Sequence, residues 1–485
     1  MRLVPRFGII QGTRQDGTIK VRPVDHFSWS HGSRKRSRAE VKADSINGHY
    51  NMPGSVAHDH LDDLLASMRL HFELIGDVPG LVTADIDSAF RRIPLKVQHR
   101  WAAGVAYLHE GIAYVSFHYA MPFGATSSVF NWHRVGDLIL TIARRILHMP
   151  MSRYVDDYFG PERQENMVQG SQLFARLVRM LLGKTAIAVD KLKSELSLVV
   201  LGILVQPSKT SVSFCLCEKK TDKWLACLEE AIVTGRLDSG RAQKLAGKLM
   251  WATQHLFYRV GRAMIKPIFA QKASKSGIVG PRLLRALVWW RSILREGVSE
   301  ARPWAMYEKA PCRLFLDAAS TPARLAGILF CDGRRLYFDG APSDHIMQQF
   351  VKRNDNQITS LEILAIMVAL STFADELRGR CVVLYSDNKG AEGATSRGSA
   401  KVCNLIHLNL EWLLPLFAKS FDHNQLIHEI WSHAFKFRMH LWVERVPSKW
   451  NIADCPSRFK YNLMEELKAV WRKPVLAELY LGESA

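Results

Sequence analysis

Acidic residues follow strand-like apolar runs at two places in the N-terminal half of the sequence. Asp85 comes directly after the run 82–84, and 71 residues later Asp156 and Asp157 stand between apolar and aromatic residues, as at the tip of a β-hairpin. Two strand ends that carry carboxylates side by side can hold two divalent ions about 3.5 to 4 Å apart, which together promote phosphoryl transfer. Hard oxygen ligands favour Mg²⁺. The structural alternative for each Asp alone is a turn or helix-cap residue.

A second series of acids runs through the C-terminal half. Asp317 ends one apolar run, Glu362 follows 45 residues later in a helix-like stretch, Asp387 ends another apolar run, and Asp454 lies 67 residues further on. Each acid again has a structural alternative. Thr359 and Glu362 form a T-x-x-E capping box, Asp387 can cap the turn that follows it, and Asp454 can lie on a solvated helix face.

The first group of acids stands in sequence motifs that resemble those of a reverse transcriptase. Asp85 with Phe90 matches the first palm motif of that family, the segment 154–157 (YVDD) matches its YxDD box, and the segment 119–128 (YAMPFGATSS) is similar to its Pro-x-Gly segment. The resemblance implies that Asp85 and Asp156 are the principal metal ligands and that Asp157 is the third acid. It also implies two Mg²⁺ ions in this site, with Mn²⁺ as the alternative ion.

The same resemblance assigns substrate contacts within these motifs. It implies that Pro122, Phe123 and Gly124 grip the RNA template and the incoming nucleotide, and that Phe90 is an aromatic gate against a sugar 2′-hydroxyl. A buried core residue is the alternative for Phe90. Retroviral enzymes commonly have Gln where this chain has Phe123, so the sequence is closer to DIRS-type and related retroelements.

The resemblance also implies substrate-binding roles for two basic residues outside these motifs. Arg22 lies in a segment similar to the part of the fingers that contacts the triphosphate of a dNTP, although His26 stands where an acid is usual. Lys193 matches the lysine of a downstream palm motif and is predicted to donate a proton to pyrophosphate.

The second group of acids resembles the four acids of an RNase H domain. Asp317, Glu362, Asp387 and Asp454 occur in the order strand, helix, strand and late helix. The resemblance implies that they hold two Mg²⁺ ions and hydrolyse the RNA strand of an RNA/DNA hybrid. In the closing motif, Val446 stands where a His often precedes the Pro, which affects product release more than metal binding.

A helical region is expected between about residues 219 and 270. Asp238 and Ser239 can cap a helix whose core-facing residues recur at helical spacing, namely Ala242, Leu245, Leu249 and Ala252. Lys244 and Lys248 then share another face, one turn apart. This face suits the backbone of a nucleic acid duplex, and a plain solvated face is the alternative.

These elements predict a mixed α/β and α+β multidomain fold. We expect fingers and palm of a right-hand polymerase over residues 1–215, a helical thumb and connection with a linker over 216–310, an RNase H-like α/β domain over 311–460, and a helical tail over 461–485. The segment 270–281, rich in Ser, Gly and Lys, is the predicted linker.

The charge of the chain favours a polyanionic partner. The 65 Lys and Arg residues exceed the 46 Asp and Glu residues by 19, which indicates nucleic acid first and an acidic membrane surface second. The sequence has no run long enough to span a bilayer and no signal peptide. We therefore expect an intracellular protein, cytoplasmic or nuclear, whose eight cysteines are free thiols.

Three functional hypotheses follow. The favoured one is an RNA-directed DNA polymerase with RNase H activity, whose partners are an RNA template, a DNA primer, RNA/DNA hybrid and dNTPs. The second is a decayed or domesticated retroelement remnant that binds nucleic acid without turnover. The third, a lone transposase-like nuclease, accounts for the second group of acids but leaves the YVDD segment unexplained.

Overall fold

The structure is a computed structural model and describes residues 3–13, 17–30, 37–187, 189–255, 259–297, 300–305, 309–400 and 421–475. It divides into an N-terminal unit, Met1–Ser213 with Arg302–Trp304, and a C-terminal unit, Phe214–Ala301 with Ala305–Ala485. The predicted mixed α/β multidomain class is confirmed. Among the described residues, none of the helices combines the length and apolar character needed to cross a bilayer.

The N-terminal unit begins with a four-stranded sheet in the order β2-β1-β4-β5. Its strands are β1 (Leu3–Thr13), β2 (Ile19–Asp25), β4 (Gly104–His109) and β5 (Ile112–Phe117). The short helices α1 (Arg38–Ala43) and α2 (Ile46–His49) follow β2 in the chain. A small core of Val4, Phe27, Val105 and Ala125 anchors this sheet.

A second sheet of the same unit carries the first group of acids. Its order is β6-β7-β3-β8, with β3 (Gly80–Asp85), β6 (Ser152–Tyr154), β7 (Asp157–Glu162) and β8 (Leu192–Glu195). The long helices of this unit are α3 (Leu61–Ile75), α4 (Thr126–Arg145) and α5 (Met167–Leu182). The apolar faces of α4 and α5 and the buried side of the sheet form one core, which includes Trp132, Tyr158 and Phe174. The strand predicted from the run 82–84 is confirmed as part of β3.

A third sheet has the order β12-β11-β10-β9. Its strands are β9 (Leu198–Val200), β10 (Ile203–Pro207), β11 (Ser211–Leu216) and β12 (Glu300–Pro303). The chain passes from one unit to the other within β11, close to the boundary predicted at residue 215.

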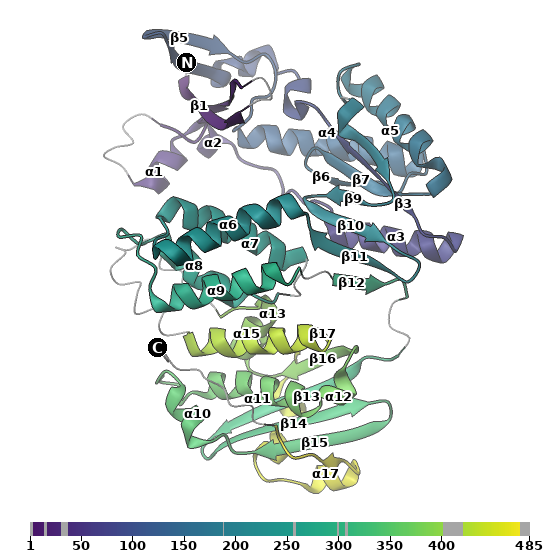
Figure 1. The fold of residues 1–485 in the computed structure, drawn as a ribbon, viewed down its shortest axis with the longest axis vertical. Coiled ribbons are helices and arrows are strands. Elements are labelled where there is room, and N and C mark those ends of the chain that lie inside the picture. Colours follow the sequence, from purple (N-terminus) through teal and green to yellow (C-terminus); the bar gives the residue numbers. More distant parts are fainter. Residues whose placement is uncertain are drawn as a thin grey trace. The chain divides into compact units, whose positions relative to one another are not determined.

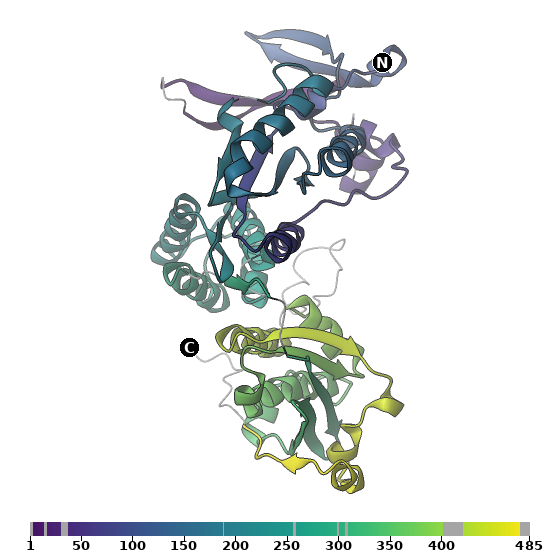
Figure 2. The same ribbon diagram turned by 90° about the vertical axis from the view of Figure 1, so that its right-hand side faces the viewer.

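The C-terminal unit begins with four helices that lie side by side, as Figures 1 and 2 show. They are α6 (Glu218–Thr234), α7 (Ser239–His255), α8 (Arg262–Gln271) and α9 (Pro281–Arg295). The predicted core face of α7 is confirmed, since Ala242, Leu245, Leu249 and Ala252 are all buried. The predicted linker 270–281 is a loop between α8 and α9 that stays inside this unit, where the backbone of Val279 bonds to Gly235.

A six-stranded sheet carries the second group of acids, in the order β17-β16-β13-β14-β15-β18. Its strands are β13 (Cys312–Ser320), β14 (Ala323–Cys331), β15 (Arg334–Gly340), β16 (Cys381–Ser386), β17 (His440–Arg445) and β18 (Val470–Trp471). The first three form an antiparallel meander, and β16 and β17 add in parallel. Helix α11 (Ile358–Thr372) crosses one face against β13 and β14 (Figure 1), and its residues 360–370 are all buried, so the helix is enclosed around its whole circumference.

The remaining helices of this unit surround the sheet. They are α10 (Asp344–Gln349), α12 (Ala374–Leu377), α13 (Lys389–Arg397), α15 (Phe421–Lys436), α16 (Asp454–Ser457) and α17 (Asn462–Glu466). The predicted helical tail, 461–485, is helical only at α17 among its described residues. The chain then extends into β18, which pairs with β15, and residues 476–485 lie outside the described part.

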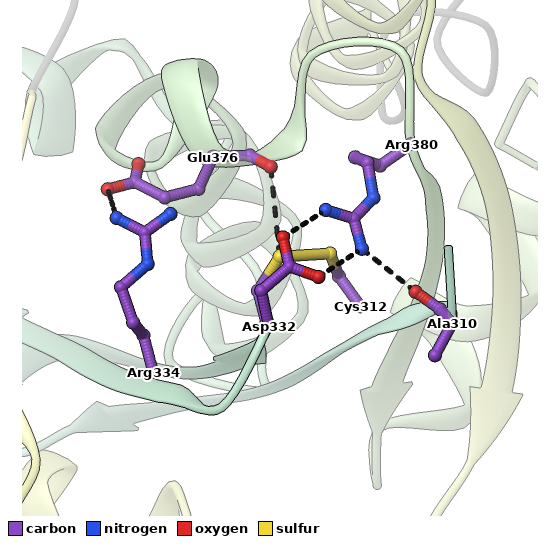
Figure 3. Close-up of a disulfide and its surroundings, with 7 residues drawn as sticks. Ala310, Cys312, Asp332, Arg334, Glu376 and Arg380 are labelled. Atoms are coloured by element: carbon purple, nitrogen blue, oxygen red, sulfur yellow. Dashed lines mark hydrogen bonds and ion pairs between the residues drawn. A yellow bond between two sulfur atoms is a disulfide. The ribbon is translucent and has the colours of Figure 1, made fainter. Parts of the chain in front are cut away.

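The expectation that all cysteines are free thiols is wrong for one pair. A disulfide joins Cys312 and Cys331, which stand opposite each other on β13 and β14 with their Cα atoms 4.7 Å apart (Figure 3). Beside it, the guanidinium of Arg380 donates hydrogen bonds to both Asp332 oxygens, at 2.5 and 2.9 Å, and to the carbonyl of Ala310. The pair could not be predicted from the sequence, because the two cysteines are 19 residues apart and only the strand register makes them neighbours.

Candidate functional site

The first three acids meet at the ends of β3 and the β6–β7 hairpin. Asp85, the last residue of β3, lies directly opposite Asp157, the first residue of β7. Asp156 lies in the two-residue turn between Tyr154 and Asp157. The sequence prediction that these carboxylates lie at neighbouring strand ends is therefore confirmed, although their catalytic role stays a prediction.

The hairpin turn is held in a strained conformation. Val155 has a φ of 55°, which a β-branched residue rarely adopts. Its carbonyl accepts hydrogen bonds from the indole of Trp132 at 2.7 Å and from the guanidinium of Arg153 at 2.9 Å, and the Asp156 carbonyl accepts one from the backbone of Ile86. Arg153 is only 2% exposed. The core of the unit thus fixes the direction in which the turn presents Asp156.

The electrostatics of this site suit a cation. Burial, followed by the negative charges of Asp156 and Asp85, raises the pKa of Asp157 to about 6. Burial and the charge of Asp85 also raise the pKa of Asp156. A divalent ion would relieve this crowding, so the residues present fit the Mg²⁺ that the sequence motifs imply.

A lysine that the sequence reading missed lies against the first acid. The ammonium of Lys191 donates a hydrogen bond to Asp85 Oδ2 at 2.6 Å, and this bond raises the pKa of Lys191. Lys193, the predicted residue, is exposed and pairs with Thr83 further along β3. The two lysines are two residues apart, and only the register of β8 against β3 distinguishes them.

Three of the predicted substrate-binding residues, Arg22, Phe90 and Phe123, come together beside the acids. The rings of Phe90 and Phe123 have centroids 5.0 Å apart, and the Arg22 guanidinium lies 5.6 Å from the Phe123 centroid. The charge of Arg22 also acts on Asp156. Phe90 is 8% exposed and packs against Trp132, so it is a core residue whose edge borders this cluster.

The Pro-x-Gly segment is shaped by backbone contacts. Pro122 is buried and Gly124 has a φ of 92°. A Cβ atom at Gly124 would lie 2.4 Å from the carbonyl oxygen of Asp25, so the segment requires glycine for both conformation and space.

Three of the four acids of the second group meet beside the inner strands β13 and β16 of the six-stranded sheet. Asp317 lies on β13, Glu362 on α11 and Asp387 directly after β16, and each offers a carboxylate oxygen within 4.8 Å of the others. They line a cavity of about 470 Å³. Within the described part of the chain, the acids of the first site do not form an equally compact group.

The structural alternatives for two of these acids are wrong. Helix α11 begins at Ile358 with Gln357 at its N-cap, so Thr359 does not cap it and Glu362 lies inside the helix, 4% exposed. The side chain that caps α13 is Asn388, which accepts from two backbone amides, and not Asp387. A buried Glu362 beside an Asp387 that does not cap the following helix therefore requires another explanation.

The chemistry of the second site fits a divalent cation closely. Burial, followed by the charges of Asp317 and Asp387, raises the pKa of Glu362 to about 9. Burial also raises the pKa of Asp317 to about 7. Among the described residues, nothing donates a hydrogen bond to the buried Glu362 Oε2, which leaves this oxygen available as a ligand.

Asp454 stands apart from the compact group. Its carboxylate forms an ion pair of 2.6 Å with Arg458 and its side chain is 35% exposed, although its charge still reaches Asp317. The solvated-face alternative therefore describes Asp454 as it stands in the structure. Its predicted role as a metal ligand requires the Arg458 pair to open.

Two polar residues near Asp454, absent from the sequence reading, support the compact group instead. The amide of Asn451 donates to the Leu316 carbonyl at 2.9 Å and reaches the carboxylates of Asp317 and Asp387, each at 3.4 Å. The Ser457 hydroxyl donates to Asp317. Both residues are buried, and their place in the closing motif beside Asp454 was the only sequence signal for them.

The two predicted duplex-binding lysines form a separate feature. Lys244 and Lys248 are exposed, one turn apart on α7, and lie on a different element from every acid of the second site. This arrangement agrees with the predicted basic face, and duplex binding by it stays a prediction.

The comparisons with known proteins give structural similarity only. No family model and no curated protein matches the sequence. The chain is similar to a foamy viral protease-reverse transcriptase in complex with RNA/DNA hybrid, with a TM-score of 0.45 and 14% identity over 92% of this chain and 50% of that chain. It is also similar to two complexes of that viral protein with double-stranded DNA, with TM-scores of 0.44 and 0.43, identities of 15% and 14%, and coverage of 92% of this chain and 65% and 78% of those chains. The chain thus spans half the length of the first of these proteins.

Proposed function

We propose that this chain is the RNA-directed DNA polymerase of a retrotransposon-like element, with a fused RNase H that acts on RNA/DNA hybrids. The observation that carries the proposal is that one chain holds two carboxylate clusters, one in each unit, and that burial and crowded negative charge raise the pKa of acids in both. The Phe123 form of the Pro-x-Gly segment favours an element of the DIRS-type group. The enzyme would copy the RNA of such an element into DNA during its transposition.

At the polymerase site, the chain would orient a primer 3′-hydroxyl and a dNTP. Two Mg²⁺ ions held by Asp85, Asp156 and Asp157 would provide charge neutralisation for transfer of the α-phosphate. The guanidinium of Arg22 would bind the triphosphate, and the Phe90–Phe123 pair would border its sugar. Lys191 holds a proton at Nζ next to Asp85 and takes over the role first predicted for Lys193, donation to the leaving pyrophosphate.

At the RNase H site, Asp317, Glu362 and Asp387 would hold the ions that activate a water against a phosphate of the RNA strand, with Asp454 as the outer ligand. Asn451 and Ser457 orient the Asp317 carboxylate from behind, as supporting hydrogen bonds do in other metal sites. Glu362 has to lose the proton that burial favours before it can serve as a ligand.

A second candidate is a remnant that binds nucleic acid without polymerase turnover. It is favoured at the first site by the Lys191–Asp85 ion pair, which occupies one oxygen of a metal ligand, and by the looser arrangement of Asp85, Asp156 and Asp157. In this case hybrid duplex would bind in a salt-dependent way and no nucleotide would be incorporated.

Two assays on one protein preparation test the proposal. Extension of a labelled DNA primer on an RNA template with Mg²⁺ and dNTPs is expected to be lost in Asp156→Asn and kept in Asp387→Asn. Cleavage of a labelled RNA/DNA hybrid is expected to show the reverse pattern. Each loss should exceed about 100-fold, since a direct metal ligand is removed. Wild-type extension no greater than that of Asp156→Asn would contradict the polymerase and support the remnant.

A further inference from the structure

Four basic side chains gather where α8 meets the end of α13, and we call them the α8–α13 cation cluster: Arg259, Arg262, Lys266 and Arg397. Arg262 and Lys266 are four residues apart and share one face of α8, and Arg259 lies in the turn just before the helix. The Arg262 guanidinium donates a hydrogen bond to the carbonyl of Arg397 at 3.1 Å. This bond joins α8 of the four-helix bundle to α13 of the RNase H-like fold.

The contact between these helices is tight and depends on a glycine. Gly398, which ends α13 with a φ of 71°, approaches both arginines so closely that a Cβ atom there would lie 2.8 Å from Arg259 Cβ and 3.2 Å from Arg262 Cδ. The cations are therefore placed by packing and are not loose surface side chains.

Among the residues that the structure describes, no carboxylate pairs with the three half-buried cations of the cluster. Arg259, Arg262 and Lys266 are half-buried, yet none of them forms an ion pair with a carboxylate of the described residues. Burial lowers the pKa of all three, and the charge of a neighbouring arginine lowers it further for Arg262 and Lys266. The buried Nε of Arg262 also has no hydrogen-bond acceptor among the described residues.

Crowded like charges of this kind favour the binding of an anion. Like charges brought together out of water cost free energy, which an anionic ligand would return on binding. Arg259 in addition holds a φ of 72°, rare for a residue with a side chain, while its guanidinium lies 5.3 Å from the Trp431 ring centroid. Backbone strain of this kind is typical of binding sites.

The position of the cluster indicates which anion it would bind. Helix α13 starts two residues after Asp387, an acid of the RNase H site, and runs for nine residues to Arg397. At 1.5 Å per residue the helix is about 13 Å long, which corresponds to about four nucleotides along one strand of a duplex. A strand with its scissile phosphate at the acids would thus bring further phosphates to the cluster.

We propose that the α8–α13 cation cluster is a binding site for the phosphodiester backbone of the nucleic acid duplex, separate from both carboxylate sites. The proposal rests on the proposed RNase H function, because that function puts a duplex at Asp387. It deepens that function by naming the residues that hold the duplex beyond the scissile phosphate.

The test is binding of a fluorescently labelled RNA/DNA hybrid in EDTA over a series of salt concentrations. Lys266→Gln and Arg259→Gln are each expected to weaken binding by about tenfold at low salt and to reduce the slope of log affinity against log salt by about one. Lys275→Gln, which removes the same charge from an exposed loop of the same unit, is the matched control and should match wild type. Wild-type affinity and slope in both cluster variants would overturn the proposal.

Two further measurements distinguish duplex binding from a structural role of these side chains and from binding to a membrane. Both cluster variants should melt at the same or a higher temperature than wild type, because each removes a half-buried charge that has no carboxylate partner among the described residues. A lower melting temperature would instead make the side chain structural and overturn the proposal. An equal loss of binding to phosphatidylserine vesicles would point to a membrane and also overturn it. Since binding is measured without metal, absence of hybrid cleavage in wild type would contradict the proposed function while the cluster is still tested.

Discussion

Replacing Glu362 with glutamine is expected to abolish cleavage of an RNA/DNA hybrid and, at the same time, to stabilise the metal-free protein. Both effects have one cause. The carboxyl is almost fully buried between Asp317 and Asp387, so its ionised form is unfavourable without a cation and its pKa rises to about 9. Glutamine resembles the protonated form, which folds well and cannot act as an anionic metal ligand.

The sign of the stability effect follows from proton linkage. A carboxyl whose pKa is raised on folding binds its proton more tightly in the folded state, so stability is greatest at low pH and falls as pH rises from about 4.5 to 9. At pH 7 the cost to the folded metal-free protein is about 3 kcal/mol, using 1.36 kcal/mol per pKa unit. Glu362→Gln should remove this cost and flatten the pH profile. Thermal unfolding in EDTA between pH 5 and 9 measures it.

Magnesium provides the second readout for this variant. Wild-type protein should melt at a higher temperature when Mg²⁺ is added, and increasingly so at higher pH, because binding releases protons. Glu362→Gln should lose this response, and its cleavage rate should fall by more than about 100-fold. Glu429→Gln is the matched control, since burial also raises the pKa of Glu429, on α15, while its partner is Gln425. A Mg²⁺ response of wild-type size in Glu362→Gln would contradict a metal role for this residue.

Replacing Asp157 with asparagine is expected to reduce primer extension by more than about 100-fold while hybrid cleavage stays at the wild-type level. Asp157 faces Asp85 across the β3–β7 pair, and the two carboxylates and Asp156 repel one another. Asparagine keeps the shape of the side chain and removes its charge. The loss would therefore report on cation binding and not on a collapsed hairpin.

The pH dependence of primer extension follows from the same carboxyl. With a pKa of about 6 in the metal-free site, Asp157 becomes protonated as pH falls through 6, so extension should decline from pH 8 to pH 5 and a higher Mg²⁺ concentration should restore part of it. Glu195→Gln, an exposed carboxylate on β8 of the same sheet, should leave both the rate and the pH profile unchanged. Equal extension by Asp157→Asn and wild type at pH 8 would remove Asp157 from the site.

Local pattern was enough to predict the elements that carry the chemistry. Apolar runs that end in Asp predicted β3 and β13, and helical spacing predicted the buried face of α7. These features depend on residues close together in the chain. Periodicity and turn chemistry act over that range, so they can be read without a structure.

Which residues become neighbours in space depends on strand register and on how separate segments of the chain pack together. Lys191 instead of Lys193 meets Asp85 because β8 pairs with β3 in one register, and a shift of one residue would turn each side chain to the other face. Cys312 and Cys331 become partners through the register of the β13–β14 hairpin. No local pattern specifies the register between β3 and β8, which are far apart in sequence.

What the sequence by itself determined is the order of the acids, the strands and helix that carry them and the basic balance of the chain, because these follow from composition and local periodicity. Only the tertiary structure decided that Glu362 lies inside α11 without a capping role and that Asp454 pairs with Arg458. It alone also brought Asn451 and Ser457 to Asp317 and gathered four cations where α8 meets α13. Each of these depends on how a helix packs against a sheet or another helix. Burial shifts the pKa of a carboxylate and sets the free-energy cost of an unpaired charge, and residues become buried only when these elements pack together.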